Sequence, residues 1–224
     1  MKILNLIFTR HYNIGNCNSK ELLKIIESIN PDVIFEELEK ATFNRIYKEN
    51  KQTTLETDAI KKHLNKQDIP HIPVDTLPRP LNFYENCKRM RNKISGATSR
   101  DAFDYRNSID NLILVTNKYG FDFLNSDTND KLLQEIDVAK EKVLKTIGDK
   151  KLHHISTLEN KINEKREDEI LNNIYTYCKH RTFNQAIVFI GSGHRKSILK
   201  KIEERSKVED IKLNWQLLKR QNPE

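Results

Sequence analysis

The clearest apolar run in the chain is residues 186–190, which lead into a glycine-rich turn. Five apolar residues in succession, three of them β-branched, are typical of a central parallel strand covered by helices on both faces. After the turn, the helical spacing of Ile198, Leu199 and Ile202 predicts a helix over residues 195–205. Open α/β sheets place their chemistry where a strand enters such a turn, at its carboxyl end.

The N-terminal part of the chain predicts a second unit of the same kind. Residues 3–9 are mostly apolar and predict a first strand, and residues 33–35 predict another. Between them, apolar residues at helical spacing predict a helix over residues 20–29, with Ser19 as its N-cap. Because a helix connects the two strands, we expect them to be parallel.

Further elements extend this sheet. Residues 40–49 and 57–65 have the pattern of helices. Residues 70–75 predict a short third strand, whose two prolines place it at a sheet edge or at a strand start. Residues 211–215 alternate between apolar and polar side chains, which predicts a last strand at the edge of the sheet.

The middle of the chain, residues 77–163, has mainly helical patterns and no predicted strand. Prolines mark its beginning, and helical patterns run over residues 109–119 and 131–147. A separate helix is predicted over residues 164–179. The sequence therefore predicts a single α/β domain over residues 1–224, in which a mostly parallel central sheet is flanked by helices and residues 77–163 form a helical insertion or cap.

Composition narrows the class of protein. The chain has 224 residues and a net charge of +7, which permits an anionic partner. Acidic and basic residues are interspersed, however, so the sequence favours a small-molecule or peptide substrate over nucleic acid. Three scattered cysteines suggest reduced thiols in the cytoplasm. No apolar run approaches the roughly 18 residues of a membrane span, so no membrane partner is expected.

Titratable side chains follow three of the predicted strands. They are His11, the Glu36/Glu37 pair and His194, and Asp75 is a candidate fourth. The carboxyl ends of parallel strands lie along one edge of a sheet, so these side chains are expected to converge. Of the two glutamates, Glu37 is the preferred catalytic residue and Glu36 is the alternative.

Two kinds of chemistry suit this set of residues. His11, Glu37 and His194 would hold a divalent metal such as Zn²⁺ or Mn²⁺ with mixed nitrogen and oxygen ligands, and the metal would activate a bound water. Without a metal, a histidine would act as general base while a glutamate fixed its tautomer. Gly191 and Gly193 would let the backbone approach a bound cofactor or ligand closely.

Short motifs at the two ends of the chain resemble those of the TraB/Tiki family, which shares a superfamily with erythromycin esterase and ChaN-like proteins. Pro31-Asp32-Val33-Ile34-Phe35-Glu36-Glu37-Leu38 resembles the family's second-strand motif, and Gly191-Ser192-Gly193-His194 is similar to its late Gly-x-x-His motif. Arg166 resembles the arginine that opens the preceding helix. The first Gly-x-x-His motif departs from the pattern, because the chain keeps His11 but has Phe8 in place of glycine.

This resemblance implies an α/β fold with a helical insertion, and a site formed by His11, Glu37 and His194. Arg166 would bind an anionic group or orient the glutamate. The superfamily includes metal-dependent peptide cleavage, ester hydrolysis and haem-related iron handling, so membership alone does not define a reaction. We expect a metal-dependent hydrolase of amide or ester bonds. The alternatives are a non-catalytic protein that binds a ligand or partner on the same fold, and a nucleic-acid-associated factor.

Overall fold

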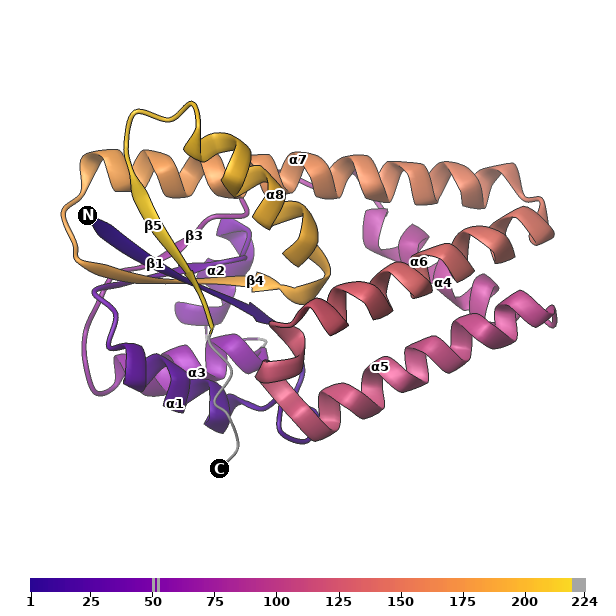
Figure 1. The fold of residues 1–224 in the computed structure, drawn as a ribbon, viewed down its shortest axis with the longest axis horizontal. Coiled ribbons are helices and arrows are strands. Elements are labelled where there is room, and N and C mark those ends of the chain that lie inside the picture. The colour runs from indigo at the N-terminus through magenta and orange to yellow at the C-terminus, as the bar shows by residue number, and fades with distance from the viewer. Residues whose placement is uncertain (50, 52, 219–224) are drawn as a thin grey trace.

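A computed structural model describes residues 1–49, 51 and 53–218 of the chain. Its strands form one parallel sheet in the order β3-β2-β4-β1-β5, and helices cover both faces (Figure 1). The predicted α/β fold is therefore confirmed. The strands are β1 (Lys2–Thr9), β2 (Val33–Glu36), β3 (His71–Pro73), β4 (Gln185–Gly191) and β5 (Leu213–Leu217).

Strand β4 lies in the middle of the sheet, as its apolar run predicts. It pairs in parallel with β1 on one side and with β2 on the other. Strands β1 and β2 are parallel, as expected, but β4 separates them, although it lies some 150 residues further along the chain. The short strands β3 and β5 occupy the two edges, where proline and alternating polar side chains are tolerated.

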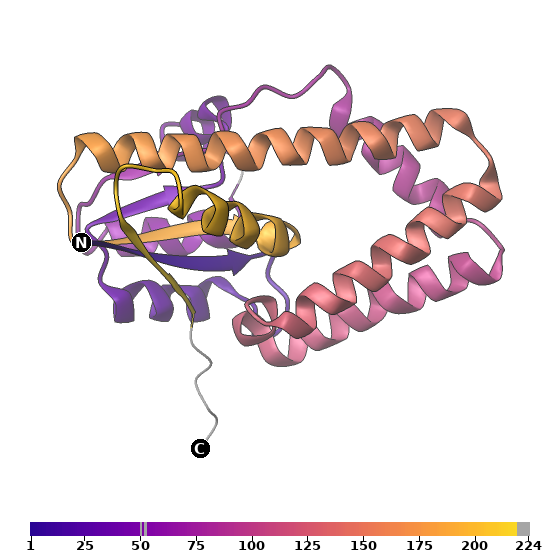
Figure 2. The ribbon, with the colours of Figure 1, turned by 45° about the horizontal axis from the view of Figure 1, so that its top comes forward.

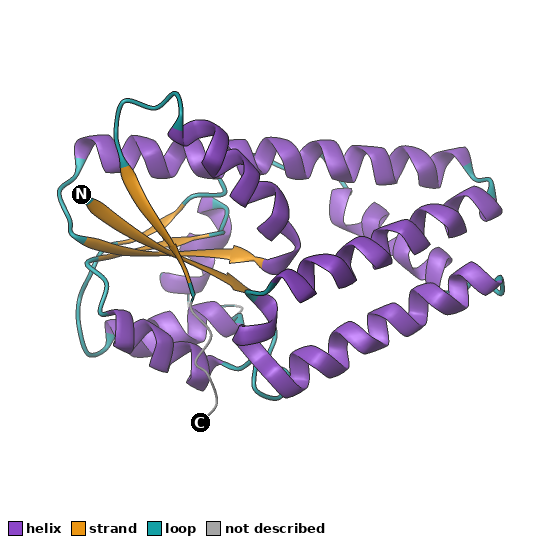
Figure 3. Ribbon diagram, in the orientation of Figure 1, coloured by secondary structure: helices purple, strands orange, loops and turns teal. Residues whose placement is uncertain are grey.

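Helices pack on the two faces of the sheet (Figure 3). Each face has its own cluster of buried apolar side chains. Leu22 and Ile26 of α1 and Ile60 of α3 pack on one face, against a cluster that includes Ile187. Helices α7 and α8 cover the opposite face, where Val188 belongs to the other cluster. The helices are α1 (Ser19–Ile29), α2 (Lys40–Tyr47), α3 (Leu55–Leu64), α4 (Phe83–Ser95), α5 (Arg100–Leu124), α6 (Asp127–Ile147), α7 (Lys150–His180) and α8 (Arg195–Ser206).

The ends of α1 show how local sequence sets an element's limits. The side chain of Asn18 accepts hydrogen bonds from the backbone N–H groups of Lys20 and Glu21, so Asn18 is the N-cap rather than the predicted Ser19. At the other end, Asn30 adopts a left-handed conformation with φ of 51° and closes the helix before Pro31.

The helical segment between β3 and β4 forms an arm that projects beyond the carboxyl edge of the sheet (Figure 2). It consists of α4, α5, α6 and the first half of α7. Helix α7 is continuous over 31 residues, so the predicted limit of the insertion at residue 163 falls inside a helix rather than between two. No glycine or proline interrupts α7, which explains why the helix continues from the arm onto the sheet.

The arm is attached next to the carboxyl ends of the strands. The side chain of Asn125, between α5 and α6, bonds to both the N–H and the carbonyl of Phe8 in β1, at 2.9 and 3.0 Å. Arg195, at the start of α8, forms ion pairs with Asp127 and Asp130 of α6. Within the described part of the chain, no helix combines the length and apolar character needed to cross a membrane.

Candidate active site

The structure brings Glu37 and His194 together at the carboxyl edge of the sheet. Oε1 of Glu37 lies 3.6 Å from Nε2 of His194, and the two side chains are only 7% and 13% exposed. Glu37 directly follows β2, and His194 ends a short 3₁₀ turn (Ser192–His194) between β4 and α8. Because β2 and β4 are adjacent parallel strands, both residues leave the sheet at the same edge.

Arg166 of α7 links these residues to Asp75. Its Nη2 donates hydrogen bonds to Oε1 of Glu37 at 2.5 Å and to Oδ2 of Asp75 at 2.8 Å. Its Nη1 donates to Oδ1 of Asn163 and lies 3.5 Å from Nε2 of His194. Burial would lower the pKa of Arg166, but Asp75 and Glu37 raise it above its usual value, so the guanidinium stays charged.

A buried carboxylate holds the other side of the His194 ring. Oε1 of Glu167 lies 2.7 Å from Nδ1 of His194, and Oε2 of Glu167 accepts a hydrogen bond from the Ser197 hydroxyl. Burial lowers the pKa of His194, but the negative charge of Glu37 and the bond to Glu167 outweigh it, so the pKa is raised from 6.5. The ring is thus oriented by one carboxylate while its Nε2 faces another.

The Glu37 carboxylate is held in its ionised form. Burial raises its pKa, but the positive charges of His194 and Arg166 and the N–H of Gly191 lower it below its usual value. Oε2 of Glu37 accepts the hydrogen bond from Gly191, while Oε1 accepts from Arg166. Both oxygens of Glu37 are therefore engaged with protein donors.

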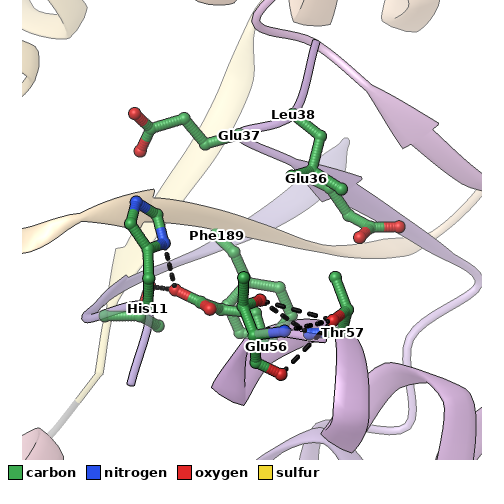
Figure 4. Close-up of a pocket in the computed structure, with 9 residues that line it drawn as sticks. His11, Glu36, Glu37, Leu38, Glu56, Thr57 and Phe189 are labelled. Carbon is green, nitrogen blue, oxygen red and sulfur yellow. Dashed lines mark hydrogen bonds and ion pairs between the residues drawn. The ribbon is translucent and has the colours of Figure 1, made fainter. Parts of the chain in front are cut away.

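His11 belongs to the same edge of the sheet but has a different partner. Its Nδ1 lies 3.2 Å from Oε1 of Glu56, the second residue of α3, and that oxygen also accepts a hydrogen bond from the Thr9 hydroxyl at 2.6 Å. The bond to Glu56 raises the pKa of His11 to about 9, so the imidazole is positively charged at neutral pH. His11 and Glu37 line one small cavity (Figure 4).

Glu36 points to the other side of the strand end from Glu37 (Figure 4), as expected for neighbouring residues of an extended chain. Its carboxylate accepts a hydrogen bond from the Tyr47 hydroxyl at 2.7 Å and lies 2.7 Å from Nδ1 of His71. These partners bind Glu36 into a cluster with the rings of Tyr47 and His71. Glu37, rather than Glu36, is the glutamate that contacts Arg166 and His194.

The two glycines of the β4 turn have different surroundings. A Cβ at Gly191 would lie 3.3 Å from Oε2 of Glu37 and 3.8 Å from the His194 ring, whereas a Cβ at Gly193 would meet open space. Gly191 therefore permits the close approach of Glu37 to the backbone. Neither glycine has a positive φ, so the requirement at Gly191 is one of space and not of backbone conformation.

This difference predicts unequal effects of alanine at the two positions. Gly191→Ala should lower the free energy of unfolding by about 1 kcal/mol, the net value of one hydrogen bond, because Arg166 prevents Glu37 from moving away freely. Gly193→Ala is the matched control and should change stability little. Urea unfolding of both variants measures this, and equal stabilities would contradict the role given to Gly191.

The arrangement of donors does not fit the predicted metal site at His11, Glu37 and His194. The guanidinium of Arg166 donates a hydrogen bond to Glu37 and lies next to Nε2 of His194. Its positive charge would repel a divalent cation bound to these two residues. Within the described ranges, no three His, Cys, Asp or Glu side chains converge as metal ligands. The metal implied by the family resemblance stays a prediction.

Two acidic residues of this edge were not predicted from the sequence. Glu167 lies in a run of charged residues, but it is on the same face of α7 as Ile170, Leu171 and Ile174. Helical spacing could therefore have indicated that its side chain is buried. Glu56 has no such signal, because an acidic residue in the first turn of a helix is ordinary.

Comparison with known proteins does not add a family. The chain matches no protein-family model, no curated protein sequence and no solved structure.

Proposed function

We propose that this protein is a hydrolase of amide or ester bonds, in which His194 donates a proton to the leaving group. The observation that carries the proposal is the Glu167–His194–Glu37 arrangement, an imidazole held at Nδ1 by a buried carboxylate with Nε2 facing a second carboxylate. A carboxylate that orients a histidine in this way is a recurring solution in acyl-transfer sites. The raised pKa of His194 keeps the proton available at neutral pH.

The positively charged side chains of His11 and Arg166 lie near the proposed proton donor. Attack on a carbonyl places negative charge on its oxygen, which fixed positive groups stabilise. His11 is charged at neutral pH and its side chain is 62% exposed, so it can reach a substrate. Arg166 forms ion pairs with Glu37 and Asp75. It therefore holds these carboxylates in place rather than binding the substrate.

The resemblance to TraB/Tiki proteins is compatible with hydrolysis, but it rests on the same residues, His11, Glu37, Arg166 and His194. A metal requirement would follow from the family but not from the geometry. We therefore propose assays with and without a chelator, and with added Zn²⁺ or Mn²⁺.

The test is hydrolysis of p-nitrophenyl esters and aminoacyl coumarin amides by the purified wild-type protein and by Glu167→Gln. The variant should lose about tenfold or more of kcat/KM, part of the 10²- to 10⁴-fold that positioned acid–base groups contribute. Because Glu167 raises the pKa of His194, the fall of kcat/KM at alkaline pH should begin at lower pH in the variant. Urea unfolding shows whether the variant is folded.

Two results would contradict this proposal. One is the absence of hydrolysis by the wild type under every metal condition, which would favour the alternative of a non-catalytic binding protein. The other is a Glu167→Gln variant that is folded and has the wild-type rate and pH profile, which would remove the role of the Glu167–His194 pair. Glu204→Gln is a control, because Glu204 is exposed and pairs with Lys200 of the same helix rather than with His194.

A further inference from the structure

A small cavity lies between the end of β1, the end of β2 and the start of α3 (Figure 4). Its volume is about 20 Å³, which is sufficient for one water molecule. Thr9, His11, Glu37 and Glu56 are among the polar residues that line it, and Phe189 contributes an apolar wall. The accessible lining of this space is mostly apolar, so a water molecule in it would depend on the few polar atoms that reach it.

Glu56 has one oxygen that the protein does not satisfy. Its side chain is only 9% exposed. Oε1 is bonded to Thr9 and His11, but Oε2 has no hydrogen-bond partner among the described residues. A buried polar atom without a partner destabilises the folded protein, and more so when it is charged, so a donor in the cavity would stabilise it.

We infer that Glu56 binds a single water molecule in this cavity and acts as the general base that activates it for attack on the substrate. The inference rests on the proposed hydrolase function. Glu37 is less suited to this role, because its two oxygens already accept from Arg166 and Gly191. Glu56 lines the cavity, and its Oε2 is a buried carboxylate oxygen without a hydrogen-bond partner among the described residues.

The proton transfers of the reaction balance with these groups. The water oxygen forms a bond to the carbonyl carbon, and one water proton passes to Oε2 of Glu56. When the carbon–nitrogen or carbon–oxygen bond breaks, its electron pair stays on the leaving group, which takes a proton from Nε2 of His194. Transfer of the proton from Glu56 back to His194 through solvent restores both residues, so that one water is consumed per bond cleaved.

The surroundings of Glu56 keep it ionised and in place. Burial raises its pKa, but the hydrogen bonds and positive charge of His11, together with Thr9, lower it below its usual value. The backbone also fixes its position relative to His11, since the N–H of Leu55 donates to the His11 carbonyl at 3.1 Å. Thr54 and Thr57 form a capping box that defines the start of α3.

A high-resolution crystal structure of the wild-type protein tests the binding of water without any substrate. We expect one water peak within hydrogen-bond distance of Oε2 of Glu56, and its loss in Glu56→Leu. Crystals soaked in a thallium salt distinguish water from a monovalent cation. An empty cavity, or an anomalous peak from thallium in it, would overturn the inference.

Hydrolysis by Glu56→Gln tests the role as general base. We expect a loss of about 10²-fold in kcat/KM, the lower end for general-base catalysis, because a glutamate with a lowered pKa is a weak base. Glu159→Gln is the control, since Glu159 is likewise a mostly buried carboxylate and is paired with Arg91 on the arm. Urea unfolding of both variants separates a catalytic effect from a loss of folded protein.

The hydrolysis rates of the wild type, Glu56→Gln and Glu167→Gln separate the role of Glu56 from the proposed hydrolase function. A folded Glu56→Gln variant with the wild-type rate, next to a slowed Glu167→Gln, would overturn the inference alone. No hydrolysis by the wild type would overturn the proposed function and the catalytic role of the water together.

Discussion

Replacement of His194 by alanine is expected to lower kcat/KM for ester or amide hydrolysis by about 10²- to 10⁴-fold, the contribution of a positioned acid–base group. The reason is that Nε2 of His194 is the proton donor, and water cannot take its oriented place between Glu37 and Glu167. The proton must be present on the ring, so wild-type activity should persist above the usual histidine pKa of 6.5 and fall at higher pH. The part of this fall that belongs to His194 should be absent from the residual activity of the variant, which keeps only the decline near pH 9 expected from His11.

The control for this experiment is His154→Ala, which removes an exposed histidine from α7 and should leave the rate unchanged. Full activity in a folded His194→Ala variant would remove His194 from the mechanism. If activity is lost but kcat/KM still falls at the same alkaline pH as in the wild type, His194 acts by a route other than proton transfer.

Replacement of Arg166 by methionine should produce the largest loss of stability, about 3–5 kcal/mol, as found when one partner of a buried ion pair is removed. The side chains of Glu37 and Asp75 are 7% and 2% exposed, and both bind Arg166. Without the guanidinium, Asp75 keeps Arg79, but the negative charge of Glu37 loses its strongest hydrogen-bond donor. Because methionine fills much of the volume of the arginine side chain, the loss of stability measures mainly the removal of the positive charge.

The pH dependence of this loss follows from the pKa of Glu37. Arg166 lowers that pKa in the folded protein, so it contributes stability that is present above the usual glutamate pKa of 4.5 and disappears as the pH falls through the lowered value. The difference between wild type and variant should therefore be largest at neutral pH and become smaller in acid.

Urea unfolding at several pH values measures both effects. Arg100→Met is the control, because the side chains of Arg100 and Asp104 are 82% and 50% exposed and such a surface pair contributes only about 0–1 kcal/mol. A loss in Arg166→Met no larger than that of the control, or one that stays constant with pH, would contradict the account of a buried charge network.

Local pattern was enough to predict most elements and the edge on which the candidate site lies. The apolar run of β4 and its glycine turn identify a central strand followed by a histidine, because burial on both faces requires continuous apolar side chains. The positions of Glu37 and His194 after their strands then follow from chain direction alone. Asn30 and Pro31 likewise mark the end of α1, because few residues tolerate a left-handed conformation.

Other features depend on contacts between distant segments. The sequence does not specify that β4 inserts between β1 and β2, since strand order depends on which helices pack on each face. It also does not show that α7 is a single helix shared by the arm and the sheet. The predicted separate helix over residues 164–179 is wrong because this segment is the second half of α7, and a change of packing partner leaves no mark in helical periodicity.

The sequence by itself determined the fold class, the principal strands and a set of candidate residues, because backbone preference and apolar periodicity are local properties. Only the tertiary structure decided which partner each charged side chain has. Glu36 and Glu37 are chemically equivalent in the sequence, and they differ because one faces Tyr47 and His71 while the other faces Arg166 and His194. Glu56 and Glu167 become candidate site residues for the same physical reason, since the effect of a buried carboxylate depends on the charges brought next to it by folding.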